Sequence, residues 1–334
     1  MQVDLPGGQR SDSRTGSRTG SLIVAPGQDV TVSVPATSAN LGPGFDSLGL
    51  ALTLYDTVRV RTSAEEGIIV EVAGEGAGNV PLDSSHLVVR TLLSTLAAAG
   101  YRAEGLHLSA ENAIPHGRGL GSSASAIVSG VLAANSLLPA EARLDAAGLL
   151  HSCSALEGHP DNVAPALVGD LAISWEDDGV FRSVRASVHP DVVPVVAIPA
   201  VELSTESARG LLPATVAHRT AAANAGRAAL LIHALTVDPS LLLEGTQDAL
   251  HQDFRAPAML PSARLLSSLR SAGFAAVISG AGPTVMCLAY GEESALEAEQ
   301  AMTKHLQAAE FGENWRVLRL GVERDGARVE GHQR

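Results

Sequence analysis

The sequence predicts a two-domain α+β fold. The chain has 334 residues, which is long for one domain and comfortable for two. Segments typical of strands and helices are mixed without the regular βαβ alternation of a doubly wound sheet. A buried-strand pattern at 192–200 opens the second half. We therefore expect domains over residues 28–190 and 191–325, preceded by a tail at 1–27.

The tail is expected to be disordered. Residues 1–27 are rich in Gly, Ser and Arg, and the segment SRTG occurs twice, at 13–16 and 17–20. With so few apolar residues, the segment cannot bury a core of its own. It has basic residues but no continuous apolar run, so it does not resemble a secretory signal. A basic arm for a partner is the functional alternative.

The first domain is expected to combine strands with long helices. Alternation of apolar and polar residues, or β-branched runs, indicates strands, and apolar residues at helical spacing indicate helices. The first helix has a serine as its N-cap and Gly100 near its end. The predicted strands are 29–37, 55–63, 67–74, 105–112 and 169–175, and the predicted helices are 84–101, 121–138 and 144–158.

The second domain is expected to begin with the strand at 192–200. A glycine-rich turn lies inside the apolar segment 274–290, which predicts two strands around that turn. A further strand is expected at 314–322. The predicted helices lie near 204–212, at 214–236, 239–250 and 293–309, and in a segment that ends at Ala272.

Charge and composition exclude several functions. The formal net charge of −13 argues against nucleic acid or an anionic membrane surface as a partner. No apolar run reaches the roughly 18 residues needed to span a bilayer. Two cysteines, Cys153 and Cys287, cannot build a disulfide framework and fit a reducing cytosol, so we expect a cytoplasmic protein.

The basic residues exclude one class of nucleotide site. The chain has a single lysine, Lys304, whereas the P-loop signature requires a lysine directly after its second glycine. A P-loop or protein-kinase mechanism is therefore excluded. Any phosphate must be held by backbone amides, by arginine or by a metal ion.

A glycine-rich loop leads into the helix predicted at 121–138. It contains Gly117, Gly119 and Gly121, and Ser122 and Ser123 follow. Free N–H groups and the positive end of the helix dipole bind anions, and glycines let the backbone approach phosphates closely. An ordinary capped helix after a flexible loop explains the glycines alone equally well.

This loop resembles the phosphate-binding loop of the GHMP kinase superfamily (galactokinase, homoserine kinase, mevalonate kinase and phosphomevalonate kinase). Two further segments resemble its motifs, VPATSANLGPGFDSLGLAL at 34–52 and SGAGPTV at 279–285. The resemblance implies an N-terminal domain like domain 2 of ribosomal protein S5 and a ferredoxin-like C-terminal domain. It also implies ATP as a substrate. The ATP-binding residues implied are Pro115, His116, Gly117, Arg118, Gly119, Leu120, Gly121, Ser122, Ser123, Ala124 and Ser125.

The first motif resembles that of homoserine kinases in particular. Mevalonate kinases and galactokinases tend to carry a Gly-Glu-His segment near the N-terminus, which this chain lacks. The segments 157–167, 202–213 and 248–257 also resemble homoserine kinases, so the likeness spans about 29–322. It implies the reaction of ATP with L-homoserine to give ADP and O-phospho-L-homoserine, a step of threonine biosynthesis.

The resemblance also implies residues that bind the amino-acid substrate. Asn40 and Asp46 correspond to the pair that holds the substrate amino acid, and a carboxylate suits an ammonium group. Arg209 and Arg255 correspond to the arginines that bind its carboxylate, and Thr205, one helical turn before Arg209, is expected to join them. The structural alternatives are turn stabilisation for Asn40 and Asp46 and a solvated helix charge for Arg255.

Metal and catalytic roles are implied in the same way. Glu157, with Ser123, is the expected Mg²⁺ site beside the ATP phosphates, and stabilisation of a loop or helix end is the alternative for Glu157. Asn162 is favoured as the group that orients the substrate hydroxyl, and Asp161 stays open as a base or a structural residue. A zinc site that would use His151, Cys153, Glu157 and His159 is rejected, because no tetrahedral set with known spacing is present.

Two rival functions stay open. One is another GHMP kinase with a mevalonate-type or sugar substrate, although Asp46 would then lack an ammonium partner. The other is a catalytically inactive member that senses nucleotide; the intact glycine loop, Glu157 and Asn162 count against it. A homodimer is possible.

Overall fold

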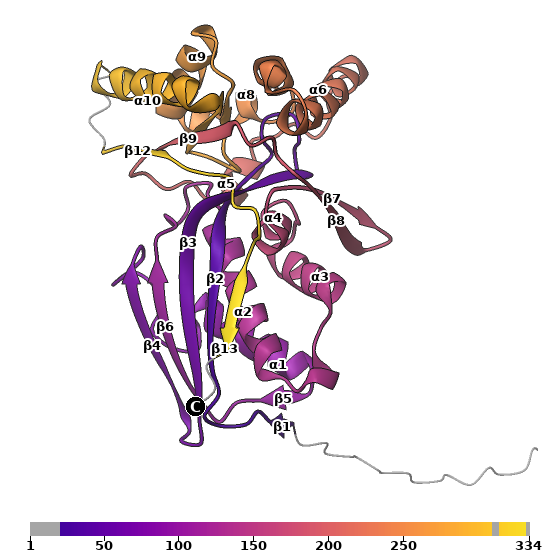
Figure 1. Ribbon diagram of the computed structural model, residues 1–334, viewed down its shortest axis with the longest axis vertical. Helices are drawn as coiled ribbons and strands as arrows, with labels where there is room; N and C mark the ends of the chain where they lie inside the picture. The colour runs from indigo at the N-terminus through magenta and orange to yellow at the C-terminus, as the bar shows by residue number, and fades with distance from the viewer. Residues whose placement is uncertain (1–20, 309–313, 332–334) are drawn as a thin grey trace, which may run out of the picture.

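Within the described residues, two large sheets lie end to end, each covered by helices, and two short strands form a small third sheet (Figure 1). The computed structural model describes residues 21–308 and 314–331. The two-domain α+β fold expected from the sequence is confirmed. Within the described residues, no helix has both the length and the apolar character needed to cross a membrane.

The larger sheet contains seven strands of the described residues and is mostly antiparallel. Its main path has the order β13-β2-β3-β6-β4, and β7 pairs with both β3 and β8. Strand β3 continues through both parts of this sheet, pairing with β6 at its far end and with β7 at its start. The strands are β2 (Asp29–Ala39), β3 (Leu48–Ser63), β4 (Gly67–Gly74), β6 (Gly105–Asn112), β7 (Leu171–Asp177), β8 (Val180–Ala186) and β13 (Arg328–Gly331).

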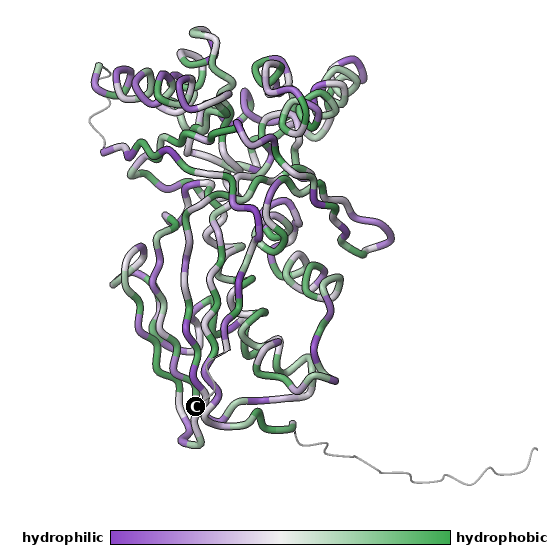
Figure 2. Tube along the Cα trace, in the orientation of Figure 1, coloured by the Kyte–Doolittle hydropathy of each residue, from purple (hydrophilic) through white to green (hydrophobic). Residues whose placement is uncertain are grey.

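Helices cover one face of this sheet. The central helix α2 (Ser122–Leu137) packs between the sheet and two other helices, α1 (Leu87–Ala98) and α3 (Ala146–Glu157). Because α2 has neighbours on most sides, its alanine-rich sequence is buried almost all round rather than along one stripe. The short helix α4 (Val163–Val168) follows α3. Much of the trace of these elements is green, and so apolar, in Figure 2, and their buried side chains form one core cluster.

The smaller sheet has the order β10-β11-β9-β12 and is antiparallel. Helices α9 and α10 pack on it around a core that includes Leu265, Cys287 and Met302. Its strands are β9 (Val192–Ile198), β10 (Ala276–Ile278), β11 (Val285–Tyr290) and β12 (Arg316–Arg319). Its helices are α5 (Thr205–Arg209), α6 (His218–Thr236), α7 (Leu242–Gly245), α8 (Gln252–Arg255), α9 (Leu260–Ser271) and α10 (Gly291–Ala308).

One hydrophobic cluster joins the two domains. Leu48 and Leu50 of β3 pack in the same cluster as Met286 of β11 and Leu231 of α6. The start of β3 thus belongs to the core that also supports the smaller sheet. Burial of these side chains, about 1.5–3 kcal/mol each, fixes the two sheets relative to each other.

The end of the chain returns to the larger sheet. Strand β13 pairs antiparallel with β2, with Arg328 opposite Ser33. The sequence had predicted no strand beyond 322. Near the other end, β1 (Leu22–Ile23) pairs parallel with β5 (Tyr101–Arg102). The described residues thus begin inside the segment 1–27 that was predicted as a tail, and the prediction for residues 1–20 lies outside them.

The helix predicted at 239–250 is wrong in its second half. A 3₁₀ helix η2 (Pro239–Leu241) and α7 replace its first half, and the helical conformation ends at Gly245. The cause is Asp248, whose carboxylate accepts hydrogen bonds from the backbone N–H groups of Leu250, His251 and Gln252. A short acidic side chain that binds nearby N–H groups competes with a helix for them.

Candidate functional site

The glycine-rich loop and the start of α2 form one wall of a cavity. Gly117, Gly119 and Gly121 have φ angles of 65°, 74° and 74°, in the left-handed region that suits glycine. Gly121 precedes Ser122, the first residue of α2. The N-terminal N–H groups of a long helix therefore face the same space as the loop, an arrangement that binds phosphate.

Asp56 of β3 holds both ends of this loop. Its Oδ1 accepts hydrogen bonds from the N–H groups of Ala113 and Ile114, at 2.9 and 3.0 Å. Its Oδ2 accepts one from the hydroxyl of Ser125, on the first turn of α2, at 3.1 Å. Burial raises the pKa of Asp56, and these three bonds oppose the rise. No sequence pattern indicated this role.

The segment 279–283 closes over the loop from the other domain. The hydroxyl of Ser279 donates to the carbonyl of Gly119 at 2.6 Å. The N–H of Gly280 donates to the carbonyl of Ala39 at 3.0 Å, and the Asn40 side chain donates to the carbonyl of Gly280 at 2.9 Å. All three motifs found in the sequence thus meet at one point.

The first motif carries Asp46 into the cavity. Asn40 and Asp46 both adopt positive φ, 69° and 54°. The side-chain oxygen of Asn40 accepts the N–H of Asp46 at 3.0 Å, so Asn40 fixes the loop that presents the carboxylate. Asn40 is nearly buried and lines the cavity. Its contact with the substrate stays a prediction.

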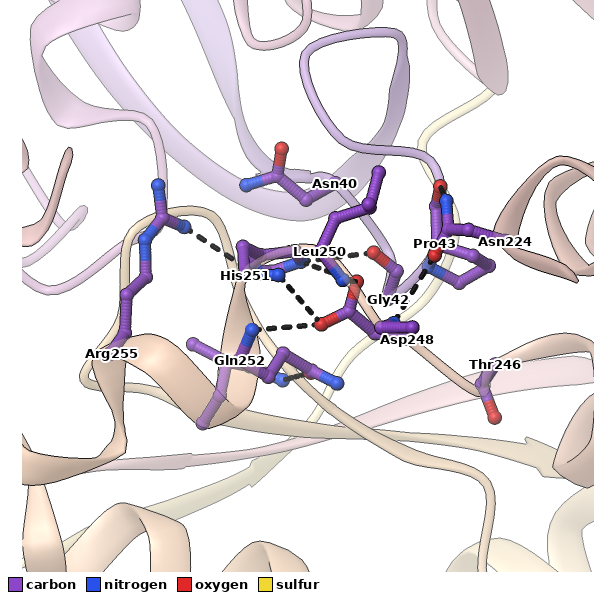
Figure 3. A network of polar contacts seen from close by, with 12 residues as sticks. Asn40, Gly42, Pro43, Asn224, Thr246, Asp248, Leu250, His251, Gln252 and Arg255 are labelled. Carbon is purple, nitrogen blue, oxygen red and sulfur yellow. Dashed lines mark hydrogen bonds and ion pairs between the residues drawn. The ribbon is translucent and has the colours of Figure 1, made fainter. Parts of the chain in front are cut away.

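Arg255 is a buried cation that lines the cavity, and Figure 3 shows its side chain beside His251. Its side chain is 2% exposed. Its guanidinium donates to the carbonyls of Ala208 and Gly280 and to Nδ1 of His251. Among the described residues no carboxylate forms an ion pair with it. Burial, followed by the charge of Arg209, lowers the pKa of Arg255.

His251 and Asp248 hold Arg255 in place (Figure 3). Nε2 of His251 donates to the carbonyl of Gly42 at 2.9 Å, which leaves Nδ1 free to accept from Arg255 at 3.1 Å. Burial lowers the pKa of His251, in keeping with this neutral ring. Asp248 in turn binds the backbone of the same turn. The buried cation therefore sits on a preorganised support.

Arg209, the last residue of α5, lines the same cavity and binds Asp46. Its two terminal nitrogens contact the two carboxylate oxygens at 2.7 and 2.8 Å. The hydrogen bonds that Arg209 donates to Asp46 raise the pKa of Arg209. The guanidinium groups of Arg209 and Arg255 also lie 5.5 and 5.4 Å from the ring centre of Phe45. Thr205, the first residue of α5, lines the cavity too.

Ser123 and Glu157 meet at the side of the glycine-rich loop. The Ser123 hydroxyl donates to a Glu157 oxygen at 2.8 Å. Burial raises the pKa of Glu157, so its negative charge is disfavoured where it lies. A bound cation would offset that cost, and both residues offer the oxygen ligands that Mg²⁺ prefers. The donor set therefore fits the expected magnesium ion.

The segment 159–162 forms the remaining wall. Nδ1 of His159 and Oδ1 of Asp161 are 2.6 Å apart, and this hydrogen bond raises the pKa of His159. Thr37 donates its hydroxyl to Oδ1 of Asn162 at 2.9 Å. His159, Asp161 and Asn162 all line the cavity. Sequence reasoning gave His159 no role here; its place two residues before Asp161 is the signal that could have found it.

A second cavity lies on the other side of the glycine-rich loop. It has a volume of about 310 Å³ and shares Ser122 and Ser123 with the first cavity. Two polar atoms in its wall, Nδ1 of His86 and Oγ of Ser129, are buried and have no hydrogen-bond partner among the described residues. Burial, followed by the charge of His116, lowers the pKa of His86. No sequence motif had pointed to His86 or Ser129.

Comparison with known proteins agrees with this geometry. The family model "GHMP kinases N terminal domain" matches residues 86–170, and the model "GHMP kinases C terminal" matches residues 221–308. Homoserine kinase of Streptomyces coelicolor is 50% identical over 301 residues, which cover 90% of this chain and 94% of that protein. Homoserine kinase of Leifsonia xyli is 48% identical over 91% of this chain and 92% of its own length.

Solved structures give the same result. The crystal structure of homoserine kinase from Cytophaga hutchinsonii matches with a TM-score of 0.80 and 30% identity, over 90% of this chain and 97% of that one. Mevalonate kinase of L. major matches with a TM-score of 0.64 at 15% identity, over 90% and 97% of the two chains, which shows a shared fold. Because close relatives match along almost the whole chain, this protein belongs to the homoserine kinase family of the GHMP kinases.

Proposed function

We propose that this chain transfers the γ-phosphoryl group of ATP to the side-chain hydroxyl of L-homoserine, which gives ADP and O-phospho-L-homoserine. The observation that carries the proposal is Arg255. A buried guanidinium without a carboxylate partner in the described part of the chain is costly unless an anion binds it. It faces the same cavity as the glycine-rich loop and Asp46. This combination suits a small molecule with a carboxylate and an ammonium group, placed beside a phosphate.

ATP would extend across both cavities. Its phosphates would lie on residues 115–125, against the N-terminal N–H groups of α2. The adenine would occupy the second cavity, where the unpartnered atoms of His86 and Ser129 offer hydrogen bonds to a polar base edge. Ser122 and Ser123 border both spaces and would mark the passage from one to the other.

L-Homoserine would lie between the two domains. Asp46 would accept its ammonium group, and Arg255 with Arg209 would bind its carboxylate through charge-assisted hydrogen bonds. Asn162 would orient its hydroxyl toward the phosphate loop. Phosphoryl transfer through a loose transition state depends mainly on such positioning and on stabilisation of charge. The proton of the hydroxyl would leave to solvent or to the phosphoryl oxygens, because Asp161 is already bound to His159.

Magnesium would be held by Ser123 and Glu157. Mg²⁺ commonly takes one or two protein carboxylates together with phosphate oxygens and waters, so this pair is sufficient for its protein ligands. When bound, the ion would neutralise charge on the phosphates.

A coupled ADP-release assay tests the function. The chain is supplied with ATP and Mg²⁺ and with L-homoserine, R-mevalonate or galactose in turn, and the product is identified by mass spectrometry. We expect sustained ADP release with L-homoserine alone and a product heavier by one phosphoryl group. ADP release with mevalonate or galactose instead would assign another substrate. ATP binding without turnover of any acceptor would favour a nucleotide sensor.

A further inference from the structure

Two side chains of opposite charge that face the candidate acceptor site, Asp46 and Arg209, are bound to each other. Asp46 and Arg209 form a two-pronged ion pair, with nitrogen–oxygen distances of 2.7 and 2.8 Å. Asp46 comes from the loop between β2 and β3, and Arg209 comes from α5 of the other domain. The pair therefore spans the cavity. That cavity has a volume of about 110 Å³, below the roughly 300–1,000 Å³ of typical ligand pockets.

The two partners of this pair are held unequally. Asp46 is fixed by the bond from its N–H to Asn40 and by the left-handed turn that it occupies. Arg209 ends a helix of five residues, α5, and its side chain is 43% exposed. Opening the pair therefore requires movement of Arg209 rather than of Asp46. Arg255, in contrast, is free of any carboxylate among the described residues.

Charge counting shows which ligand can open this pair. A zwitterion supplies an ammonium group for Asp46 and a carboxylate for Arg209, so each group exchanges one partner for another. A molecule with one of these charges satisfies one member and leaves the other unpaired in a partly buried site. An unpaired charge in such a position is unfavourable. Discrimination then comes from a penalty against the wrong ligand as well as from contacts with the right one.

We propose that the Asp46–Arg209 ion pair is a specificity filter that opens for small zwitterionic α-amino acids with a terminal hydroxyl and stays closed to molecules that carry one of the two charges. The filter rests on the proposed function, because it acts at the acceptor site of that reaction. It assigns the pair a role beyond simple contact with the substrate. Breaking the pair by mutation should therefore improve the use of singly charged acceptors.

Two truncated acceptors test the filter. 3-Aminopropan-1-ol lacks the carboxylate of homoserine, and 4-hydroxybutyrate lacks its ammonium group. Arg209→Gln frees Asp46, so kcat/KM for 3-aminopropan-1-ol should rise about three- to tenfold, while that for L-homoserine falls. Asp46→Asn frees Arg209 and should raise kcat/KM for 4-hydroxybutyrate by a similar factor. A role limited to substrate contact gives no rise, because each acceptor lacks the group that the deleted side chain would bind.

Arg255→Gln is the matched control. It removes the same charge from the same cavity and leaves the ion pair intact, so it measures the through-space effect of a lost positive charge. If it fails to fold, Arg209→Lys, which keeps the charge but loses the two-pronged contact, should give an intermediate rise with 3-aminopropan-1-ol. The filter is refuted if kcat/KM for the truncated acceptors is unchanged in both pair variants, or rises as much in Arg255→Gln. A parent chain that binds ATP and ignores L-homoserine would instead overturn the proposed function, and the filter with it.

Discussion

Asn162 and Asp161 are neighbours in sequence and share one long hydrogen bond, from Nδ2 of Asn162 to Oδ1 of Asp161 at 3.5 Å, but their other partners differ. Asp161 is almost fully buried and bound to His159. Asn162 accepts a hydrogen bond from Thr37 and borders the cavity, where its amide nitrogen has a second hydrogen to donate. This arrangement suits Asp161 to positioning and Asn162 to contact with the substrate hydroxyl.

Paired variants separate the two roles. Asn162→Leu keeps the size and removes both hydrogen-bonding functions, so kcat should fall by about 100-fold through misorientation, with the KM for L-homoserine little changed. Asp161→Asn should reduce kcat less, because no proton transfer to Asp161 is required. Steady-state kinetics on folded variants measures both. A larger loss in Asp161→Asn, within the 10²–10⁴-fold typical of a lost base, would identify Asp161 as the base.

The bond between His159 and Asp161 predicts a pH dependence of stability. It raises the pKa of His159 above its usual value of 6.5. A raised pKa stabilises the folded state fully below the unfolded value, and this stabilisation is lost as the pH rises through the folded value. Asp161→Asn should therefore cost about 1–3 kcal/mol at pH 5.5 and clearly less at pH 9. Urea unfolding at both pH values measures the difference.

The control for this prediction is Glu71→Gln. Glu71 binds His107 at 3.0 Å on the exposed surface of the larger sheet. Solvent screens this pair, so its removal should change stability little at either pH. An equal cost of Asp161→Asn at both pH values would show that a neutral hydrogen bond, rather than the charge on His159, stabilises the segment.

Most residues of the candidate site could be found from the sequence, but their pairing could not. The motifs placed Asn40, Asp46, Arg209 and Arg255 together, and all four line one cavity. Nothing in the sequence indicated that Asp46 and Arg209 would bind each other, since 163 positions separate them. The role proposed for His86 could not be predicted for a related reason. It depends on burial without a partner, which only the fold creates.

At the scale of elements, one carboxylate organises the phosphate loop. Asp56 of β3 receives bonds from the end of β6 and from the start of α2, on either side of the loop. Asp56→Ala should leave these buried donors unsatisfied and lower the stability by roughly 2–4 kcal/mol. It should also raise the KM for ATP, because the loop loses its fixed ends. Thermal unfolding and ATP titration measure the two effects.

Asp145→Ala is the control for Asp56→Ala. Asp145 caps α3 by accepting the N–H of Gly148 at 2.8 Å on an exposed surface. Loss of such a cap should cost about 1 kcal/mol and leave ATP binding unchanged. If Asp56→Ala were no worse than this control in both measurements, the loop would hold its shape without Asp56.

Local patterns predicted the long elements better than the short ones. The helices α2, α6 and α10 and most strands appear where periodicity placed them. The predicted helix at 239–250 failed because Asp248 draws three N–H groups away from helical partners. Strand β13 was missed because its four exposed residues carry little apolar pattern and form a strand only by pairing with β2.

At the scale of the whole molecule, the two domains meet through backbone atoms at the phosphate loop. A Cβ atom on Gly119 would lie 2.2 Å from the carbonyl oxygen of Ser279 and 2.9 Å from that of Gly282. No rotation of a side chain could relieve these two contacts, because both are with backbone atoms. The site therefore depends on a separation between domains that leaves no room for a methyl group.

Gly119→Ala and Gly117→Ala form a matched pair that tests this dependence. Both glycines have positive φ, 74° and 65°, so both variants bear a similar strain of about 1 kcal/mol or more. A Cβ on Gly117 would approach only the side chain of Glu202, at 3.3 Å, a contact that a shift of a few tenths of an ångström would relieve.

Gly119→Ala should push the segment 279–283 away from the loop. Because that segment also positions Asn40 and Arg255 through Gly280, kcat/KM should fall at least tenfold for ATP and for L-homoserine together. Gly117→Ala should stay within about threefold of the parent for both substrates, since it bears the φ strain alone. Steady-state kinetics with each substrate varied, together with thermal unfolding, makes the comparison. Equal losses in the two variants would mean that loop strain, and not the contact between domains, limits activity.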